Sequence, residues 1–111
     1  MTGVQTCALP ISDQGDSLGN TPLFWAADTG EAGTVRALLD GKANPNRANR
    51  QGITPLMAAA RGGRLPAVEA LLAGGANPQL RDFTGRSALG WAETSRSRSV
   101  ASRLRKAGVS D

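Results

Sequence analysis

Residues 52–79, GITPLMAAARGGRLPAVEALLAGGANPQ, repeat residues 19–46, GNTPLFWAADTGEAGTVRALLDGKANPN, at an offset of 33 positions. Thr-Pro-Leu, a paired alanine, the Leu-Leu pair and Ala-Asn-Pro recur at the same places in both copies. A second shift of 33 reaches GRSALGWAETSRSRSVASRLRKAG (85–108), in which only the glycines at both ends and a few apolar positions keep the register. A period of this length indicates stacked supersecondary units, and the third copy is degenerate and terminal.

Each copy predicts two short helices. Thr21 and Thr54 are good N-caps, and a proline follows each at the first helical position, where its missing N–H is not needed. Glycine, asparagine and proline then stop the second helix and begin a turn. We expect helices at about 22–29, 32–40, 55–62 and 65–73. The apolar stripe of the second helices is Val35, Leu38 and Leu39 in one copy and Val68, Leu71 and Leu72 in the other.

The segments TPLFWAA, TPLMAAA, ALLDGKANPN and ALLAGGANPQ resemble ankyrin repeats, whose hallmark is T-P-L-H-x-A within a β-turn and two antiparallel helices. Asp16, Asn49 and Asp82 each lie three residues before the glycine that precedes the motif, as in the family's hairpin. The resemblance covers about residues 16–111. It implies an all-α ankyrin-repeat solenoid of helix-turn-helix units with short hairpin or turn connections, formed by two full repeats and a C-terminal capping repeat.

The sequence departs from the family pattern in three places. The motif histidine is replaced by Phe24, Met57 and Gly90. We therefore expect its hydrogen bond with the N-cap threonine to be lost and apolar packing to substitute. Lys42 occupies the helix-ending place that Gly75 and Gly108 hold in the other copies. The last copy has Ser-Ala (87–88) for Thr-Pro and a more polar second helix, which suits a capping repeat whose outer side faces water.

The first residues, MTGVQTCALPI (1–11), have no repeat register. They lack the basic region and the long apolar segment of a signal peptide, and Cys7 has no second cysteine to pair with. Back-translated from a GTG start codon, the stretch closely resembles a short-read sequencing adapter. We expect residues 1–12 to be a non-native or disordered leader and residues 13–111 to be the ankyrin repeat domain. Its repeats are expected at about 19–51, 52–84 and 85–111.

The composition argues against several classes of function. The chain has no histidine and one cysteine, which excludes Ser-His-Asp and Cys-His nucleophile pairs, histidine-bound metals and disulfides. It also lacks the glycine-rich phosphate-binding motifs. We therefore expect no enzyme activity, no cofactor and no metal ligand. No apolar stretch approaches the roughly 20 residues that span a bilayer, so membrane insertion is not expected. Localisation is left open, with the cytoplasm as the starting expectation.

A linear stack leaves its hairpin tips and the exposed side of its first helices as an extended concave surface. Ile53 and Phe83 are notable there, because an apolar side chain at a hairpin tip packs on a neighbour or marks a contact site. Trp25 and Trp91, at equivalent places, are predicted to pack between the two helices of their own repeats. The candidate partner-binding residues are Leu18, Asn20, Asp28, Arg50, Gln51, Ile53, Arg61, Phe83, Thr84 and Arg86.

The resemblance implies non-catalytic binding of a protein partner through this concave surface. Two alternatives stay open: the C-terminal regulatory array of a longer enzyme or transporter, and binding of an acidic partner by the arginine-rich cap, TSRSRSVASRLRK (94–106). Nucleic acid is disfavoured because no aromatic residue is interleaved there to stack bases. We expect a monomer, with the uncapped N-terminal face as the place where copies would associate.

Overall fold

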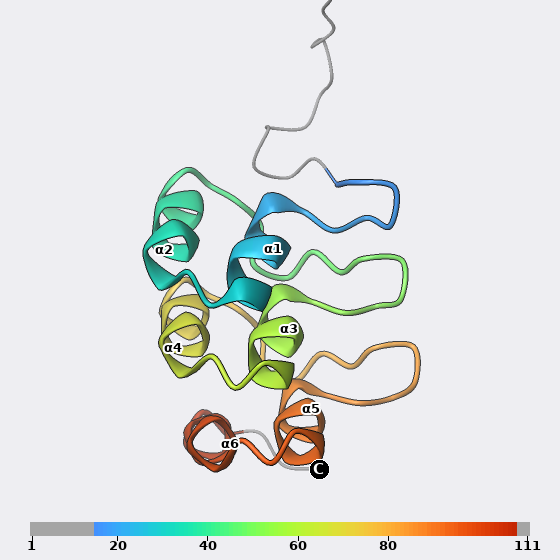
Figure 1. The fold of residues 1–111 in the computed structure, drawn as a ribbon, viewed down its shortest axis with the longest axis vertical. Coiled ribbons are helices and arrows are strands. Elements are labelled where there is room, and N and C mark those ends of the chain that lie inside the picture. Colours follow the sequence, from blue (N-terminus) through green and yellow to red (C-terminus); the bar gives the residue numbers. More distant parts are fainter. Residues whose placement is uncertain (1–14, 109–111) are drawn as a thin grey trace, which may run out of the picture.

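The computed structural model describes residues 15–108, which form three stacked helical hairpins (Figure 1). The first helices α1, α3 and α5 make one column and the second helices α2, α4 and α6 make the other, each packed on the next. Among the described residues there is no strand, only one isolated antiparallel bridge between Arg81 and Ser87. This confirms the all-α solenoid. The helices are α1 (Pro22–Thr29), α2 (Ala32–Asp40), α3 (Pro55–Arg61), α4 (Leu65–Ala73), α5 (Ala88–Thr94) and α6 (Arg98–Lys106).

The first helices begin as the capping residues predict. The hydroxyl oxygens of Thr21, Thr54 and Ser87 accept the backbone N–H three residues later, at 3.1, 3.3 and 3.3 Å. α1 ends at Gly30, whose φ of 82° is the left-handed conformation that glycine adopts freely. α3 ends at Arg61, one residue earlier than expected, and the left-handed residue that follows is Gly63.

The replacements of the motif histidine behave differently from one another. Phe24 is buried in the core, as expected for apolar packing. Met57 is also buried, but its sulfur accepts the backbone N–H of Thr54 at 3.5 Å. The expectation that the hydrogen bond at this cap is lost was therefore wrong for the second repeat, where a thioether, a weak acceptor, closes the cap reciprocally.

The core lies between the two columns of helices. Small side chains on the first helices let the second helices approach closely, and Ala26, Ala27, Ala59 and Ala60 are all buried. The predicted stripe of the second helices faces this core. Val35, Val68 and Leu71 are fully buried, whereas Leu38, Leu39 and Leu72 are partly buried at its edge.

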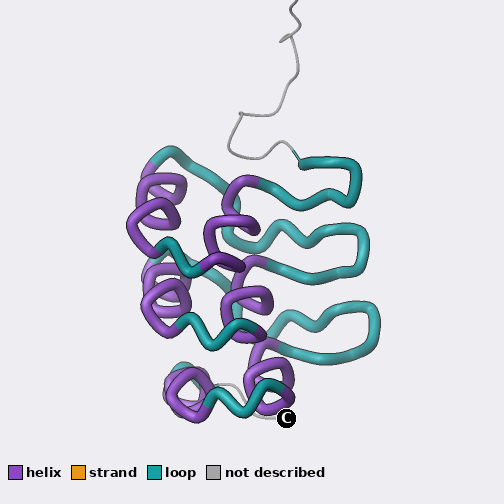
Figure 2. The backbone as a smooth tube through the Cα atoms, viewed as in Figure 1, coloured by secondary structure: helices purple, strands orange, loops and turns teal. Residues whose placement is uncertain are grey.

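Three similar hairpin loops project from the first-helix side of the stack (Figure 2). Backbone hydrogen bonds link each loop to the next, from Arg50 N–H to the Leu18 carbonyl at 3.0 Å and from Phe83 N–H to the Gln51 carbonyl at 3.2 Å. Gly52 is needed at its place because its φ is 80° and a Cβ there would lie 2.7 Å from Phe83 Cδ1. The loops therefore form one continuous surface.

Lys42 has a φ of 75°, in the same left-handed region as Gly75 and Gly108. Because a Cβ costs energy in this conformation, Lys42→Gly is expected to raise the free energy of unfolding by about 0.5–1 kcal/mol. Chemical denaturation measures the change. The matched control is Gly75→Lys, where a Cβ would meet no neighbouring atom, so only the backbone conformation opposes it. A Lys42→Gly variant that is less stable than the wild type would contradict this account.

The outer side of the third repeat, facing away from the second repeat, is charged. Glu93, Arg96, Arg98 and Arg105 line a groove of about 490 Å³ between α5 and α6, and Arg105 pairs with Glu93 at 2.7 Å. In the second repeat the four matching positions, 33 residues earlier, are alanine, glycine and two leucines. The third repeat covers that site closely, since a Cβ on Gly63 would lie 2.8 Å from Ser97 Oγ. Charged side chains in these places are those of a capping repeat.

Candidate partner-binding surface

The candidate residues lie on the hairpin loops and at the ends of the first helices, but they differ in exposure. Six are exposed, namely Leu18, Arg50, Gln51, Phe83, Thr84 and Arg86. Asp28 and Arg61 are intermediate, and Asn20 and Ile53 are buried. The largest exposed apolar side chains among them are Phe83, at 79%, and Leu18, at 62%.

A groove of about 440 Å³ brings part of this set together between the second and third hairpins. Its walls come from both hairpin tips, from the end of α3 and from α5. Leu18, Asn20 and Asp28 lie outside it, and Arg86 adjoins it over the ring of Trp91. The residues that line this inter-hairpin groove are Arg50, Gln51, Ile53, Arg61, Asp82, Phe83, Thr84 and Trp91.

Asn20 and Ile53 are buried, although the sequence places both in hairpins; for Ile53 this agrees with packing on a neighbour, one of the two alternatives left open. They occupy equivalent positions on the returning arm of their hairpins and are 6% exposed each. Asn20 Oδ1 accepts Asn49 Nδ2–H from the next hairpin at 2.8 Å, and Ile53 joins the core below the groove. Arg86, the equivalent residue of the last hairpin, is exposed. Among the described repeats, the residue at this position is buried where another hairpin packs against it and exposed in the third hairpin.

Trp25 is exposed and Trp91 is only partly buried against the core, so neither fills the space between the two helices of its repeat as predicted. Both lie on the hairpin side of their helices. The indole N–H of Trp25 donates to Asp16 Oδ2 at 3.2 Å, and that of Trp91 donates to Asp82 Oδ2 at 2.9 Å. Trp25 remains 48% exposed, and Trp91 is part of the groove.

The sequence contains a pattern that could have placed the tryptophans. Trp25 falls outside the spacing of the buried Leu23, Ala26 and Ala27, which share one helix face. Moreover, each tryptophan follows an aspartate by nine residues, whereas the middle repeat has asparagine and alanine at the corresponding places. The aspartate and the tryptophan therefore occur together, as a hydrogen-bonded pair would require.

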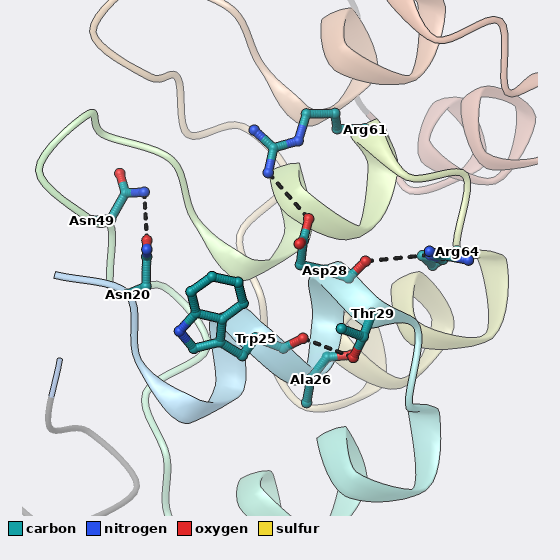
Figure 3. A network of polar contacts seen from close by, with 8 residues as sticks. All are labelled: Asn20, Trp25, Ala26, Asp28, Thr29, Asn49, Arg61 and Arg64. Carbon is teal, nitrogen blue, oxygen red and sulfur yellow. Dashed lines mark hydrogen bonds and ion pairs between the residues drawn. The ribbon is translucent and has the colours of Figure 1, made fainter. Parts of the chain in front are cut away.

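A polar network joins the first helices beside the groove (Figure 3). Arg61 Nη2 lies 3.1 Å from Asp28 Oδ1, so the end of α3 is paired with the end of α1. Arg64 Nε donates to the Asp28 carbonyl at 3.3 Å. Because Asp28 and the Arg61 guanidinium are each about one-third exposed, the ion pair itself adds little stability. Its main consequence is to fix the Arg61 side chain on the side of the stack that carries the hairpins.

Two guanidinium groups lie over the ring of Trp91. The Arg61 Cζ atom is 5.6 Å from the ring centroid, and the Arg86 Cζ atom is 4.7 Å from it. Both distances are within the range of cation–π attraction. Trp91 therefore holds arginines from two different repeats in place, and its own orientation is set by the bond to Asp82.

Asp82 organises the third hairpin. Its Oδ1 accepts the backbone N–H groups of Thr84, at 2.9 Å, and Arg86, at 3.0 Å, and also the Thr84 hydroxyl. Burial raises the pKa of this carboxyl, but the hydrogen bonds from Thr84, Arg86 and Trp91 outweigh burial and keep the pKa below its ordinary value. Asp16 does the same in the first hairpin, where the backbone N–H of Asn20 is the main cause of its lowered pKa.

Asp82→Asn is expected to lower the free energy of unfolding at pH 7 by about 0.5–1.5 kcal/mol, the value of one hydrogen bond. In the second hairpin Asn49 accepts the two equivalent N–H groups, so the substitution mainly weakens the hydrogen bond from the Trp91 indole. A carboxyl with a lowered folded-state pKa stabilises the fold above its unfolded pKa of about 4 and loses that contribution as the pH falls through the folded value. Wild type and variant should therefore converge in stability as the pH falls below the unfolded pKa of about 4. A difference in urea midpoints that stays constant from pH 7 into this acid range would refute this assignment.

Between residues 15 and 108 there is no group of three or more side chains that could hold a metal ion, and no helix there is long and apolar enough to cross a membrane. A family model of three ankyrin repeats matches residues 4–82 and again residues 42–110. The chain belongs to the ankyrin repeat family.

Ankyrin repeats are in general non-catalytic modules that bind other proteins. Membership of the family therefore suggests a protein partner for this chain. The expected leader, residues 1–12, lies outside the residues that the structure describes, although the family match begins at residue 4. The repeat boundaries expected within residues 13–111 remain predictions.

Proposed function

We propose that this ankyrin stack is a non-catalytic recognition module that binds a protein partner along its hairpin tips and the adjoining sides of α1, α3 and α5. The observation that carries the proposal is the inter-hairpin groove of about 440 Å³. It joins an exposed phenylalanine to arginines that are held by Trp91 and Asp28. Aromatic and arginine side chains are the types enriched in binding hot spots.

The opposite side of the stack is less suited to binding. The groove between α2 and α4 measures about 210 Å³, less than half the volume of the inter-hairpin groove. On α6, Arg103 pairs with Glu69 at 2.9 Å and Arg105 pairs with Glu93 at 2.7 Å. These pairs reduce the positive charge that the cap offers to an acidic partner. The cap groove between α5 and α6 is slightly larger than the inter-hairpin groove, at about 490 Å³, but no aromatic side chain lines it and its Arg105 is paired with Glu93. The first-helix side is therefore better suited to a protein partner than the cap.

Photo-crosslinking of a partner tests the proposal. The partner is selected from a display library against the full chain, and benzoylphenylalanine is placed at Gln51, on the rim of the groove, or at Arg36, on α2. We expect covalent capture from position 51 and none from position 36. Both side chains are exposed, so reactivity alone does not favour either position. Capture from position 36 alone would contradict the proposal.

The chain is expected to be a monomer, and light scattering at the concentrations of the crosslinking experiment checks this.

A further inference from the structure

The inter-hairpin groove carries positive charge that residues 15–108 neutralise only in part. Arg50 and Arg86 make no ion pair within residues 15–108. Arg61 shares the carboxylate of Asp28, and both partners remain about one-third exposed. The carboxylate of Asp82 is satisfied by the hairpin N–H groups, the Thr84 hydroxyl and the Trp91 indole. Of the three arginines Arg50, Arg61 and Arg86, only Arg61 is therefore paired with a carboxylate, that of Asp28.

Two of these arginines are held in place before any partner arrives. The guanidinium groups of Arg61 and Arg86 lie over the Trp91 ring, with their Cζ atoms 5.6 and 4.7 Å from its centroid. A guanidinium has five N–H donors in a planar fork, so contact with an aromatic ring leaves donors that match a carboxylate in a bidentate pair. Side chains that are already ordered lose less entropy on binding. The arrangement therefore favours carboxylates as its ligands.

An apolar site adjoins the charges. The Phe83 ring lies against Gly52 of the neighbouring hairpin, yet it is 79% exposed. Ile53 forms the buried floor of the groove beside it. A partner that covers Phe83 would remove a large aromatic surface from water, which is favourable. The groove therefore offers an apolar contact within reach of its arginines.

We propose that the inter-hairpin groove is specific for an acidic segment of a protein that carries one large apolar side chain, with Asp or Glu placed on either side of it. The proposal rests on the proposed function and adds the chemistry of the partner. The apolar side chain packs on Phe83, and the carboxylates pair with Arg50, Arg61 and Arg86. A nucleic acid fits less well, because Trp91 already carries two guanidinium groups and is not free to stack a base.

A random library of 16-residue peptides displayed on phage, selected against the full chain and sequenced, tests this inference. We expect enriched peptides to combine Asp or Glu with one Phe, Leu or Trp at a fixed spacing. Synthetic versions of these peptides are then titrated against the charge-reversed variant Arg50→Glu/Arg86→Glu. Their affinity should fall by about tenfold or more, since charge-assisted contacts are replaced by repulsion.

The matched control is Arg36→Glu/Lys106→Glu, which makes the same change in net charge at two exposed positions on α2 and α6. It should bind the peptides with nearly wild-type affinity. An equal loss in both variants would mean attraction by net charge alone and would overturn the inference. A single-stranded 20-nucleotide DNA that competes with the peptides for the groove at physiological salt would overturn it in favour of nucleic acid.

The failure of this inference differs from the failure of the proposed function. If the enriched peptides have no acidic bias but lose affinity when Phe83 is replaced by alanine, the partner chemistry is wrong and the binding surface stands. If no peptide is enriched, or if the enriched peptides bind the Phe83→Ala/Arg86→Ala variant as tightly as the wild type, the proposed surface itself is wrong.

Discussion

Replacement of Leu71 by alanine is expected to lower the free energy of unfolding by about 2–5 kcal/mol. Leu71 is fully buried on α4, which is the middle helix of its column and packs on both α2 and α6. Removing its side chain leaves a cavity that several helices would have to move to fill. Because a short stack has a small total stability, the variant should be largely unfolded near 37 °C.

Urea denaturation followed by circular dichroism measures this loss, with Leu72→Ala as the matched control. Leu72 follows Leu71 on the same helix and loses the same atoms, but it is only partly buried at the edge of the core. Its replacement should cost clearly less. A cost below about 1 kcal/mol for Leu71→Ala, or equal costs at both positions, would mean that the buried face of α4 is assigned incorrectly.

Joint replacement of Phe83 and Arg86 by alanine should weaken binding of a selected partner by about tenfold to a hundredfold, the loss expected for a hot-spot pair. Phe83 supplies the exposed apolar surface of the groove, and Arg86 supplies a guanidinium that lies over the Trp91 ring. Both side chains are exposed and neither belongs to the hydrophobic core. The helix content and the melting temperature should therefore stay nearly unchanged.

Lys106→Ala combined with Arg36→Ala is the control for the binding loss, since both residues are exposed and lie on second helices. Isothermal titration calorimetry gives the affinities. Charge reversal at Arg103, Arg105 and Lys106 that abolishes binding, while the Phe83/Arg86 double variant binds normally, would favour the arginine-rich cap instead. Because Arg103 and Arg105 are ion-paired within the fold, that variant also needs a melting curve.

Local residues were enough to predict the helices. The Thr-Pro starts and the glycines after the first helices act through short-range hydrogen bonds and backbone sterics, so their effects can be inferred from neighbouring residues. The same holds for the left-handed conformation of Lys42, which follows from the glycines 33 and 66 residues later. Arg96, at φ 60°, shows the limit of such inference. Glycine occupies the two matching positions, Gly30 and Gly63, where a side chain of the next repeat lies close, whereas the third repeat has an arginine there.

The candidate site was predicted less well, because its exposure depends on contacts between repeats. Asn20 and Ile53 lie in hairpins, which are usually solvated, but both are 6% exposed. The role of Trp91 was missed for a similar reason, since its partners come from a hairpin nine residues earlier and from the end of α3. The repeat register could be inferred from the sequence. The packing of one hairpin against the next could not, because it depends on contacts between residues about 30 positions apart.

The two indole N–H groups offer the most direct test of where the partner binds. Trp25 and Trp91 are the only tryptophans of the chain, and both donate to hairpin aspartates on the proposed binding side. In a ¹H–¹⁵N correlation spectrum each gives a separate indole signal, which is followed while a selected partner is added to saturation. The account predicts that the Trp91 signal shifts while the backbone amides of α6 (Arg98–Lys106) stay in place. Shifts confined to those α6 amides, with both indole signals unmoved, would contradict it.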